Sequence, residues 1–159
     1  MNARILTVSR KQPDWINEGF QTYARRLQGM MPLDLTEIAP MDRRGQESAR
    51  QIDLYRQQEA QKIRAACKAG EYIIALDESG KQLDTAALAR FVGQLRDTAR
   101  APVFVIGGAD GLHPEFLAEA PSRLALSALT LPHGLVRVVL AEALYRAVSL
   151  LNNHPYHRA

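Results

Sequence analysis

The stretch that decides the fold is PVFVIGG, residues 102–108, an apolar run that ends in two glycines. An uninterrupted apolar run of this length is typical of a strand buried on both faces, as in a parallel sheet. The next residues, ADGLHPEFLAEA (109–120), indicate a loop and a short helix with Pro114 at the favoured first helical position. Strand, glycine-rich loop and helix together are the repeating unit of an α/β domain.

The same alternation runs through the rest of the chain. Four further strands are predicted, at RILTVS (4–9), LDLTEIA (33–39), EYIIALD (71–77) and RLALSAL (123–129), and a turn is predicted at ESGK (78–81). Four further helices are predicted, over 14–27, from the Ser48–Gln51 capping box to Gly70, over 85–97 behind the cap Asp84, and over 131–152. Regular alternation of this kind predicts a three-layer α/β domain with ligands bound where strand ends meet loops, near Leu76, Gly107 and Leu129.

Composition is that of a globular protein with one domain over residues 1–159. Hydrophobic residues make up 47% of the 159 residues and charged residues 23%, and no stretch reads as a linker or a repeat. The net charge is +3 and the pI is near 9.2, and most of the basic residues are arginines. Arginine suits phosphate oxygens, so nucleic acid is one interpretation, and ordinary surface pairing is the other.

The chain shows no sign of export or of membrane insertion. The start, MNARILTVSR, alternates like a strand and lacks the apolar core of a signal peptide. Arg137, Glu142 and Arg146 interrupt the longest apolar stretch, which makes it a poor membrane span. We therefore expect a soluble, cytoplasmic protein without membrane contact. The single cysteine, Cys67, excludes an intrachain disulfide and a zinc site built from cysteines.

The last predicted helix is apolar on nearly every side. Its apolar residues, among them Leu135, Val139, Leu140 and Ala143, do not fit a single stripe. A helix of this kind is buried on more than one face. It either lies under the sheet within one chain or forms a subunit interface.

Several chemical motifs are weak or absent. IGGADG (106–111) lets backbone approach a ligand closely, but its glycines do not match the dinucleotide fingerprint, and a tight structural turn explains them equally well. His154 and His157 could share a metal with His133 or His113, but Pro155 disfavours the regular helix that this would need. We expect no metal site. The absence of a G-x-S-x-G elbow argues against nucleophilic hydrolysis.

Three stretches together carry a specific resemblance: FVIGGADGL (104–112), LSALTLPHGLVRVVLAEALYRA (126–147) and NNHPYHR (152–158). They closely resemble the bacterial RlmH family, also called YbeA, which are SPOUT-class methyltransferases acting on pseudouridine in large-subunit ribosomal RNA. Length, order of motifs and the early TVSRKQPDW (7–15) agree as well, so the resemblance covers the whole chain.

The resemblance implies a fold that periodicity alone does not predict. It implies a SPOUT-type α/β domain with a mostly parallel sheet and a carboxy-terminal trefoil knot over about residues 102–159. It also implies a homodimer. The implied cofactor is S-adenosyl-L-methionine, held by backbone groups at Leu76, Gly107, Gly108, Leu126, Ser127, Ala128, Leu129, Thr130 and Leu131.

The resemblance also gives the carboxy-terminal HPYHR a role. The target, N3 of pseudouridine, carries a proton that must be removed before the nitrogen can attack a methyl group. His157 suits that work near neutral pH, with His133 as a second possibility. Arg158 would offset negative charge on the base, and Tyr156 would stack on it or donate a hydrogen bond. The sulfonium of the donor already carries positive charge, so no metal is needed. The alternative is a tail without a role.

The implied substrate is 23S ribosomal RNA, and we expect the assembled ribosome because the chain has no separate RNA-binding domain. Arginines spread over the surface, with Arg25, Arg26, Arg43 and Arg44 as candidates, would contact RNA electrostatically. The main alternative is a non-catalytic RNA-binding factor in ribosome assembly that keeps the cavity without turnover.

Overall fold

The computed structural model describes residues 1–158, without the side chains of residues 157 and 158. Its strands all run parallel, in the order β2-β1-β4-β3-β5. The strands are β1 (Ala3–Val8), β2 (Leu33–Ile38), β3 (Glu71–Gln82), β4 (Ala101–Ile106) and β5 (Ser122–Ala125). The helices are α1 (Asp14–Leu27), α2 (Ala49–Ala66), α3 (Thr85–Asp97), α4 (Pro114–Glu119), α5 (His133–Leu151) and the short 3-10 helix η1 (Pro155–Arg158).

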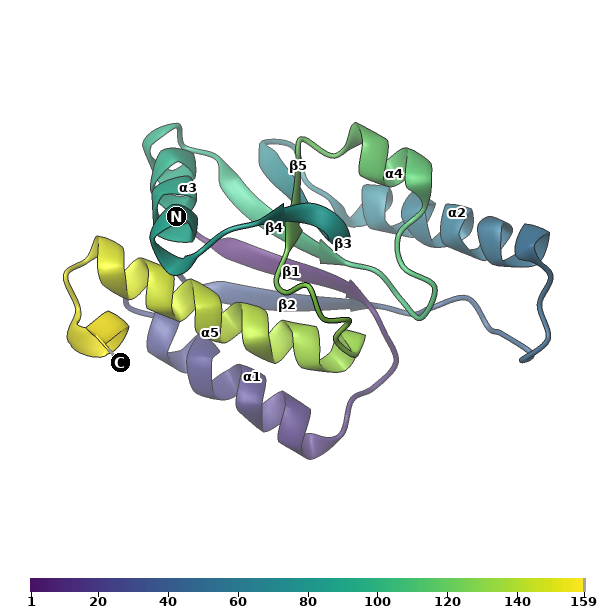
Figure 1. The fold of residues 1–159 in the computed structure, drawn as a ribbon, viewed down its shortest axis with the longest axis horizontal. Helices are drawn as coiled ribbons and strands as arrows, with labels where there is room; N and C mark the ends of the chain where they lie inside the picture. The colour runs from purple at the N-terminus through teal and green to yellow at the C-terminus, as the bar shows by residue number, and fades with distance from the viewer. Residues whose placement is uncertain (159) are drawn as a thin grey trace.

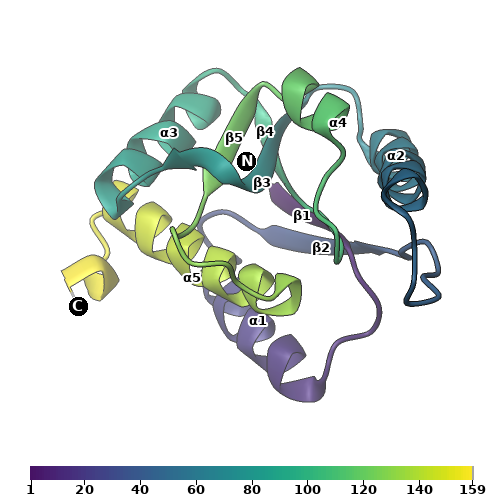
Figure 2. The same cartoon turned by 45° about the vertical axis from the view of Figure 1, so that its right-hand side comes forward.

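The elements form three layers, as the sequence predicts (Figure 1). One face of the sheet packs against α1, α3 and α5 around the larger hydrophobic core, and the other packs against α2 and α4. The turned view separates these two sets of helices on either side of the sheet (Figure 2). Within the described residues, no helix is both long and apolar enough to cross a lipid bilayer.

Local signals in the sequence correctly predict where α2, α3 and α4 begin, whereas α5 begins at His133 and not at residue 131. The Ser48 hydroxyl accepts a hydrogen bond from the Gln51 amide at 3.2 Å, and the Gln51 side chain accepts one from the Ser48 amide at 2.9 Å. The Asp84 carboxylate accepts from the Ala87 amide at 2.7 Å, and Pro114 is the first residue of α4. Each cap satisfies an amide that the helix leaves without a partner.

The predicted turn at residues 78–81 is wrong, because β3 continues through it to Gln82. After Leu76 the strand shifts register by a bulge and then pairs again with β5, so that Lys81 lies opposite Leu124. Gly80 permits this, since a Cβ atom there would lie 2.7 Å from the backbone of Leu124. The residue pattern that suggests a turn instead allows two backbones to come into close contact.

Two other predicted boundaries differ from the structure. The helix predicted to end at Gly70 ends at Ala66, and Gly70, with a φ of +85°, lies in the turn that leads into β3. The strand predicted over residues 123–129 ends at Ala125. The chain beyond it leaves the sheet, and Leu126 and Leu131 line a cavity instead.

Helix α5 lies between α1 and α3 and is buried on several sides within one chain. Its side chain Val138 meets Gly19 of α1, and Leu151 meets Gly93 of α3. A partly exposed strip remains, which includes Leu135, Val139, Glu142, Ala143 and Arg146. The prediction of burial on more than one face is therefore confirmed, and much of that burial comes from the chain itself.

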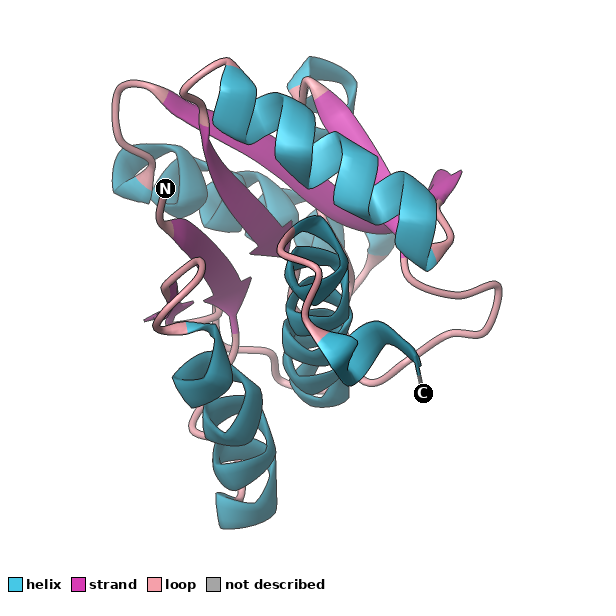
Figure 3. Cartoon of the chain, turned by 90° about the vertical axis from the view of Figure 1, so that its left-hand side faces the viewer, coloured by secondary structure: helices cyan, strands magenta, loops and turns pink. Residues whose placement is uncertain are grey.

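The chain turns back on itself after α5 (Figure 3). Asn153 has a φ of +56°, and the His154 amide donates to the Ser149 carbonyl at 2.8 Å. A left-handed residue followed by this hydrogen bond is the usual way in which a helix is closed and its chain reversed. As a result η1 lies beside α5.

Candidate active site

The bulge of β3 after Leu76 and the carboxyl ends of β4 and β5 surround one cavity of about 810 Å³. Its walls come from residues 76–78, from residues 106–112 and from the loop that joins β5 to α5. Strand ends of a parallel sheet meet at one edge, and open α/β sheets bind their ligands there. A volume of this size suits a small-molecule cofactor.

The loop after β4 is a tight turn that only glycines allow. The Gly111 amide donates to the Gly108 carbonyl at 3.1 Å, and Gly111 has a φ of +75°. A Cβ on Gly107 would lie 2.7 Å from the Gly111 carbonyl carbon, so any side chain there would displace the turn. This geometry keeps the backbone of the loop exposed at the wall of the cavity.

The loop after β5 is tied to the extended end of β3. The Ser127 hydroxyl accepts from the Leu129 amide at 3.0 Å and gives the loop its bend. The Thr130 hydroxyl donates to the Glu78 carboxylate at 3.4 Å, and this hydrogen bond connects the loop after β5 to β3. The two segments thereby form one continuous wall of the cavity.

The structure brings together the residues predicted to hold the cofactor. All of them except Ala128 line the cavity: Leu76, Gly107, Gly108, Leu126, Ser127, Leu129, Thr130 and Leu131. Ala128 is exposed and does not line it. Apolar side chains, open backbone and the carboxylates of Asp77 and Glu78 suit a ligand with a flat apolar part and a positive charge.

His133 lies at the edge of the cavity, at the start of α5. Burial lowers its pKa below the ordinary value of 6.5, and the positive charge of Arg137 lowers it further. Arg137 is fully buried and is held by Ser9 Oγ at 2.7 Å and by Glu37 at 3.2 Å. His133 is therefore neutral at neutral pH and able to accept a proton.

Tyr156 lies in the tail after α5 and packs on the last turns of that helix. Its ring centroid lies 4.4 Å from that of Tyr145, and the Arg146 guanidinium lies 4.9 Å from the Tyr156 centroid. The Tyr156 hydroxyl donates to Glu142 Oε1 at 3.1 Å. Burial, together with this hydrogen bond, raises the pKa of Tyr156 to about 12. Near pH 7 the phenol is therefore a hydrogen-bond donor and not a base.

The tail and the cavity lie apart within one chain. The cavity reaches α5 at His133 and Val136, whereas Tyr156 packs on Tyr145. At a rise of about 1.5 Å per residue, Val136 and Tyr145 are about 14 Å apart along the helix. Figure 1 shows the tail at the opposite end of α5 from the loops of the cavity. The side chains of His157 and Arg158 lie outside the described residues, although their backbone belongs to η1.

The arginines predicted to contact RNA differ in their surroundings. Arg25, Arg26 and Arg44 are exposed. Arg43 is not available in the same way, because its guanidinium is bound to Glu59 at 2.7 Å and to Asp110 at 2.8 Å. An RNA phosphate at Arg43 would have to compete with these two internal ion pairs.

The described histidines are dispersed. His113 caps the start of α4 and lies 3.1 Å from Asp53, His133 lies at the cavity and His154 lies in the tail. Within the part of the chain that the structure describes, no group of three His, Cys, Asp or Glu side chains has the arrangement of a metal site.

The residues of these sites that were not predicted from the sequence include Arg56 and Glu142. Arg56 of α2 lines the cavity, and Glu142 of α5 holds Tyr156. The spacing of Glu142 and Arg146, one helical turn apart, indicates a paired surface, but it does not indicate a tyrosine from beyond the helix end. Arg56 gives no local signal, because helix α2 has many exposed polar residues.

Comparison with known proteins agrees with this arrangement. The family described as Predicted SPOUT methyltransferase matches residues 1–157. The chain is 46% identical over 159 residues to a ribosomal RNA large subunit methyltransferase H from Nitrosomonas eutropha, with 100% of both chains covered. It is 48% identical over 158 residues to the protein of the same name from Ralstonia pickettii, with 99% of both covered.

Solved structures show the same fold. A probable methylase family protein from Haemophilus influenzae Rd KW20 aligns with a TM-score of 0.55 and 14% identity, over 98% of this chain and 69% of that one. TrmJ from Z. mobilis ZM4 aligns with a TM-score of 0.51 and 15% identity, over 92% and 70%. With the family matched over nearly the whole sequence and full-length relatives at this identity, the chain belongs to the SPOUT methyltransferase family.

Proposed function

We propose that the chain is a ribosomal RNA methyltransferase that transfers the methyl group of S-adenosyl-L-methionine to N3 of a pseudouridine in 23S ribosomal RNA. The observation that carries the proposal is the cavity at the bulge of β3 and the ends of β4 and β5, which gathers the predicted backbone segments in a member of the SPOUT family. The names of its full-length relatives support ribosomal RNA of the large subunit as the substrate.

The residues of the cavity fit this cofactor. Its glycine loop offers open backbone, and the Asp77 and Glu78 carboxylates favour a positively charged ligand. When bound, the cofactor supplies a methyl group already activated by a sulfonium. The protein must bind and orient both partners and accept the proton from N3. His133 at the cavity, or His157 in the tail, would accept that proton.

We infer that a second copy of the chain completes the active site. The tail cannot reach the cavity of its own chain while Tyr156 is packed on Tyr145 and Glu142. The partly exposed apolar strip of α5, with Leu135, Val139 and Ala143, is suited to pack against another copy. In such a homodimer, the tail of one protomer would act at the cavity of the other.

Mixing two inactive variants tests this arrangement. Gly108→Val presses a side chain against Val8 and Glu59 and so displaces the glycine loop that forms a wall of the cavity, and His157→Ala removes the imidazole from the tail. Each alone should be inactive, and the mixture should recover part of the activity, because one mixed site combines an intact cavity with an intact tail. Activity that stays absent after mixing, while sedimentation shows that mixed dimers form, would mean that each chain acts alone.

The substrate itself is tested with labelled cofactor. We expect the label from S-adenosyl-L-methionine to enter 23S RNA of the assembled ribosome, at a pseudouridine, and not free RNA or the isolated large subunit. A cytoplasmic location follows from such a substrate. Cofactor binding without transfer to any of the three substrates would favour the non-catalytic assembly factor.

We also infer a trefoil knot within about residues 102–158. The match to the SPOUT methyltransferase family over residues 1–157 supports this inference. Covalent joining of the termini would trap the knot. In denaturant, the joined chain should then be more compact than an unknotted circle of equal length, and an equal hydrodynamic radius would refute the knot.

A further inference from the structure

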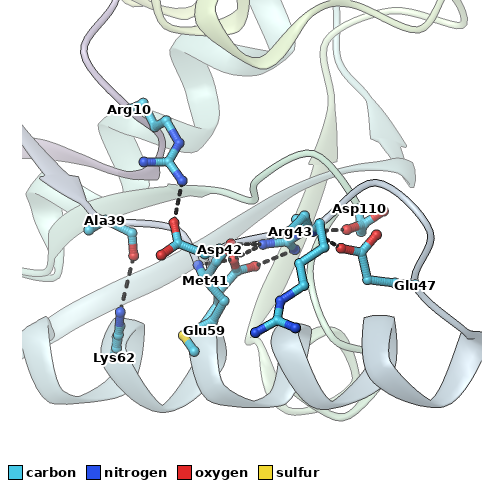
Figure 4. A network of polar contacts seen from close by, with 10 residues as sticks. Arg10, Ala39, Met41, Asp42, Arg43, Glu47, Glu59, Lys62 and Asp110 are labelled. Carbon is cyan, nitrogen blue, oxygen red and sulfur yellow. Dashed lines mark hydrogen bonds and ion pairs between the residues drawn. The ribbon is translucent and has the colours of Figure 1, made fainter.

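Two arginines, Arg43 and Arg56, lie at or beside the cavity, and they differ in how tightly the protein holds them. Arg43 is the more tightly held one (Figure 4). Its guanidinium donates to Glu59 Oε2 at 2.7 Å, to Asp110 Oδ2 at 2.8 Å and to the Met41 carbonyl at 2.7 Å. These contacts tie the loop before α2 and the helix itself to the loop that contains Gly107 and Gly108.

The contacts of Arg43 also settle the charge of its neighbours. Glu59 is buried and Asp110 lines the cavity, and both carboxylates are paired with the same guanidinium. Asp110 therefore adds little net negative charge to the cavity wall, and Arg43 adds little positive charge. Neither group is left to recognise an ion in the cavity.

Arg56 lies three residues before Glu59 on α2 and also lines the cavity. Its nearest carboxylate oxygen is Asp53 Oδ1, at 3.7 Å, and the same oxygen lies 3.1 Å from His113 Nε2. The Arg56 Nε atom is buried and has no hydrogen-bond partner among the described residues. A buried N–H of a charged group without a partner is costly unless a ligand supplies the acceptor.

Arg56 is also the only lysine or arginine among the described residues that line the cavity. Asp77 and Glu78, at another part of the lining, carry the opposite charge. A ligand with one carboxylate at one end and positive charge elsewhere would match this distribution. Because the guanidinium offers several N–H donors in one plane, it suits a carboxylate well.

We propose that Arg56 is a binding residue for the carboxylate at the amino-acid end of S-adenosyl-L-methionine. The inference rests on the proposed function, since it places that cofactor in this cavity. An RNA phosphate is the other oxyanion that a guanidinium could bind. A side chain that lines the cavity and is only 26% exposed favours a small ligand inside the cavity over a backbone outside it.

The test compares two ligands that differ at the amino-acid end. 5′-Methylthioadenosine keeps the nucleoside and the sulfur but has no carboxylate. By calorimetry, Arg56→Gln should bind S-adenosyl-L-methionine about 10- to 100-fold more weakly, the range expected for one charged hydrogen-bonded contact, and should bind 5′-methylthioadenosine with unchanged affinity. Arg56→Lys should lose less, because it keeps the charge without the planar fork. Arg50→Gln, on an exposed part of the same helix, is the matched control.

The possible outcomes separate the subsite from the proposed function. Unchanged affinity of Arg56→Gln for S-adenosyl-L-methionine would overturn the subsite alone, and weaker ribosome association in that variant would assign Arg56 to an RNA phosphate. An equal loss for both ligands would overturn it as well, because Arg56 would then only shape the wall. If the unaltered chain bound no S-adenosyl-L-methionine, the proposed function and the subsite would both fail.

Discussion

His133 is held neutral by two features of its surroundings, its burial and the charge of Arg137 one turn along α5. The pKa of His133 is lower in the folded chain than its ordinary value of 6.5, so the unfolded chain binds a proton there more readily. The free energy of unfolding must therefore fall as the pH drops from above 6.5 toward the lowered pKa, and stay constant below it.

Substituting His133 by glutamine should remove that part of the pH dependence. Between pH 8 and pH 5, the unfolding free energy of the unaltered chain should fall by more than that of His133→Gln. The reason is that only the unaltered chain has a histidine with a lowered pKa at this position. Urea unfolding across this range measures it. A difference that does not vary with pH would show that His133 titrates alike in both states.

Glu142 positions the tail through the hydroxyl of Tyr156, and it also binds Arg146. Glu142→Gln keeps an acceptor for the hydroxyl but weakens both contacts, so it should lower methyl transfer less than Glu142→Ala. Cofactor affinity should stay the same in both variants, because the cavity lies at the other end of α5. Turnover on ribosomes, measured beside calorimetry, checks this, and equal cofactor loss in both variants would contradict it.

At the scale of elements, β3 depends on one residue without a side chain. A Cβ on Gly80 would lie 2.7 Å from two backbone atoms of Leu124, which cannot move without disturbing β5. Gly80→Ala should therefore destabilise the fold by about 1–3 kcal/mol, the range for overpacking. Gly29, where a Cβ would meet nothing within 4 Å, is the matched control. The midpoints of thermal unfolding are compared between Gly80→Ala and Gly29→Ala. Equal midpoints would show that the backbone at residue 80 has room for a Cβ atom.

The same residue shows where sequence reasoning stops. Helix starts at Ser48 and Asp84 could be predicted because their caps act within a few residues. The extension of β3 through Gly80 could not, because its partner lies on β5, distant in sequence. The cavity was predicted by the shared position of strand ends. The place of Tyr156 was not, because it depends on the left-handed turn at Asn153 and on Glu142.

At the scale of the whole molecule, the exposed strip of α5 predicts a dimer. Val139→Glu places a charge in the middle of that strip and should convert the dimer to a monomer, or prevent folding. Leu54→Glu, at an exposed apolar residue on α2, is the control and should remain dimeric. Sedimentation measures the oligomeric state of both variants. If the unaltered chain itself sedimented as a monomer, the proposed interface on α5 would be wrong.

Removing the tail tests its role without touching the cavity. A chain that ends at Asn153 keeps every residue that lines the cavity and all of α5. It should bind S-adenosyl-L-methionine and dimerise as before, yet transfer no methyl group. Undiminished transfer to ribosomes would mean that residues 154–159 have no part in the reaction.

The position of α5 also has a consequence for how the protein is made. Helix α1 and helix α3 both pack on α5, which lies between them and is the last long element of the chain. At a synthesis rate of about 5–20 residues per second, α1 leaves the ribosome about ten seconds before α5 exists to cover it. Throughout that interval the apolar side of α1 has no native neighbour on one flank. The nascent chain therefore exposes an apolar helix surface for several seconds, the kind of surface on which chaperones act.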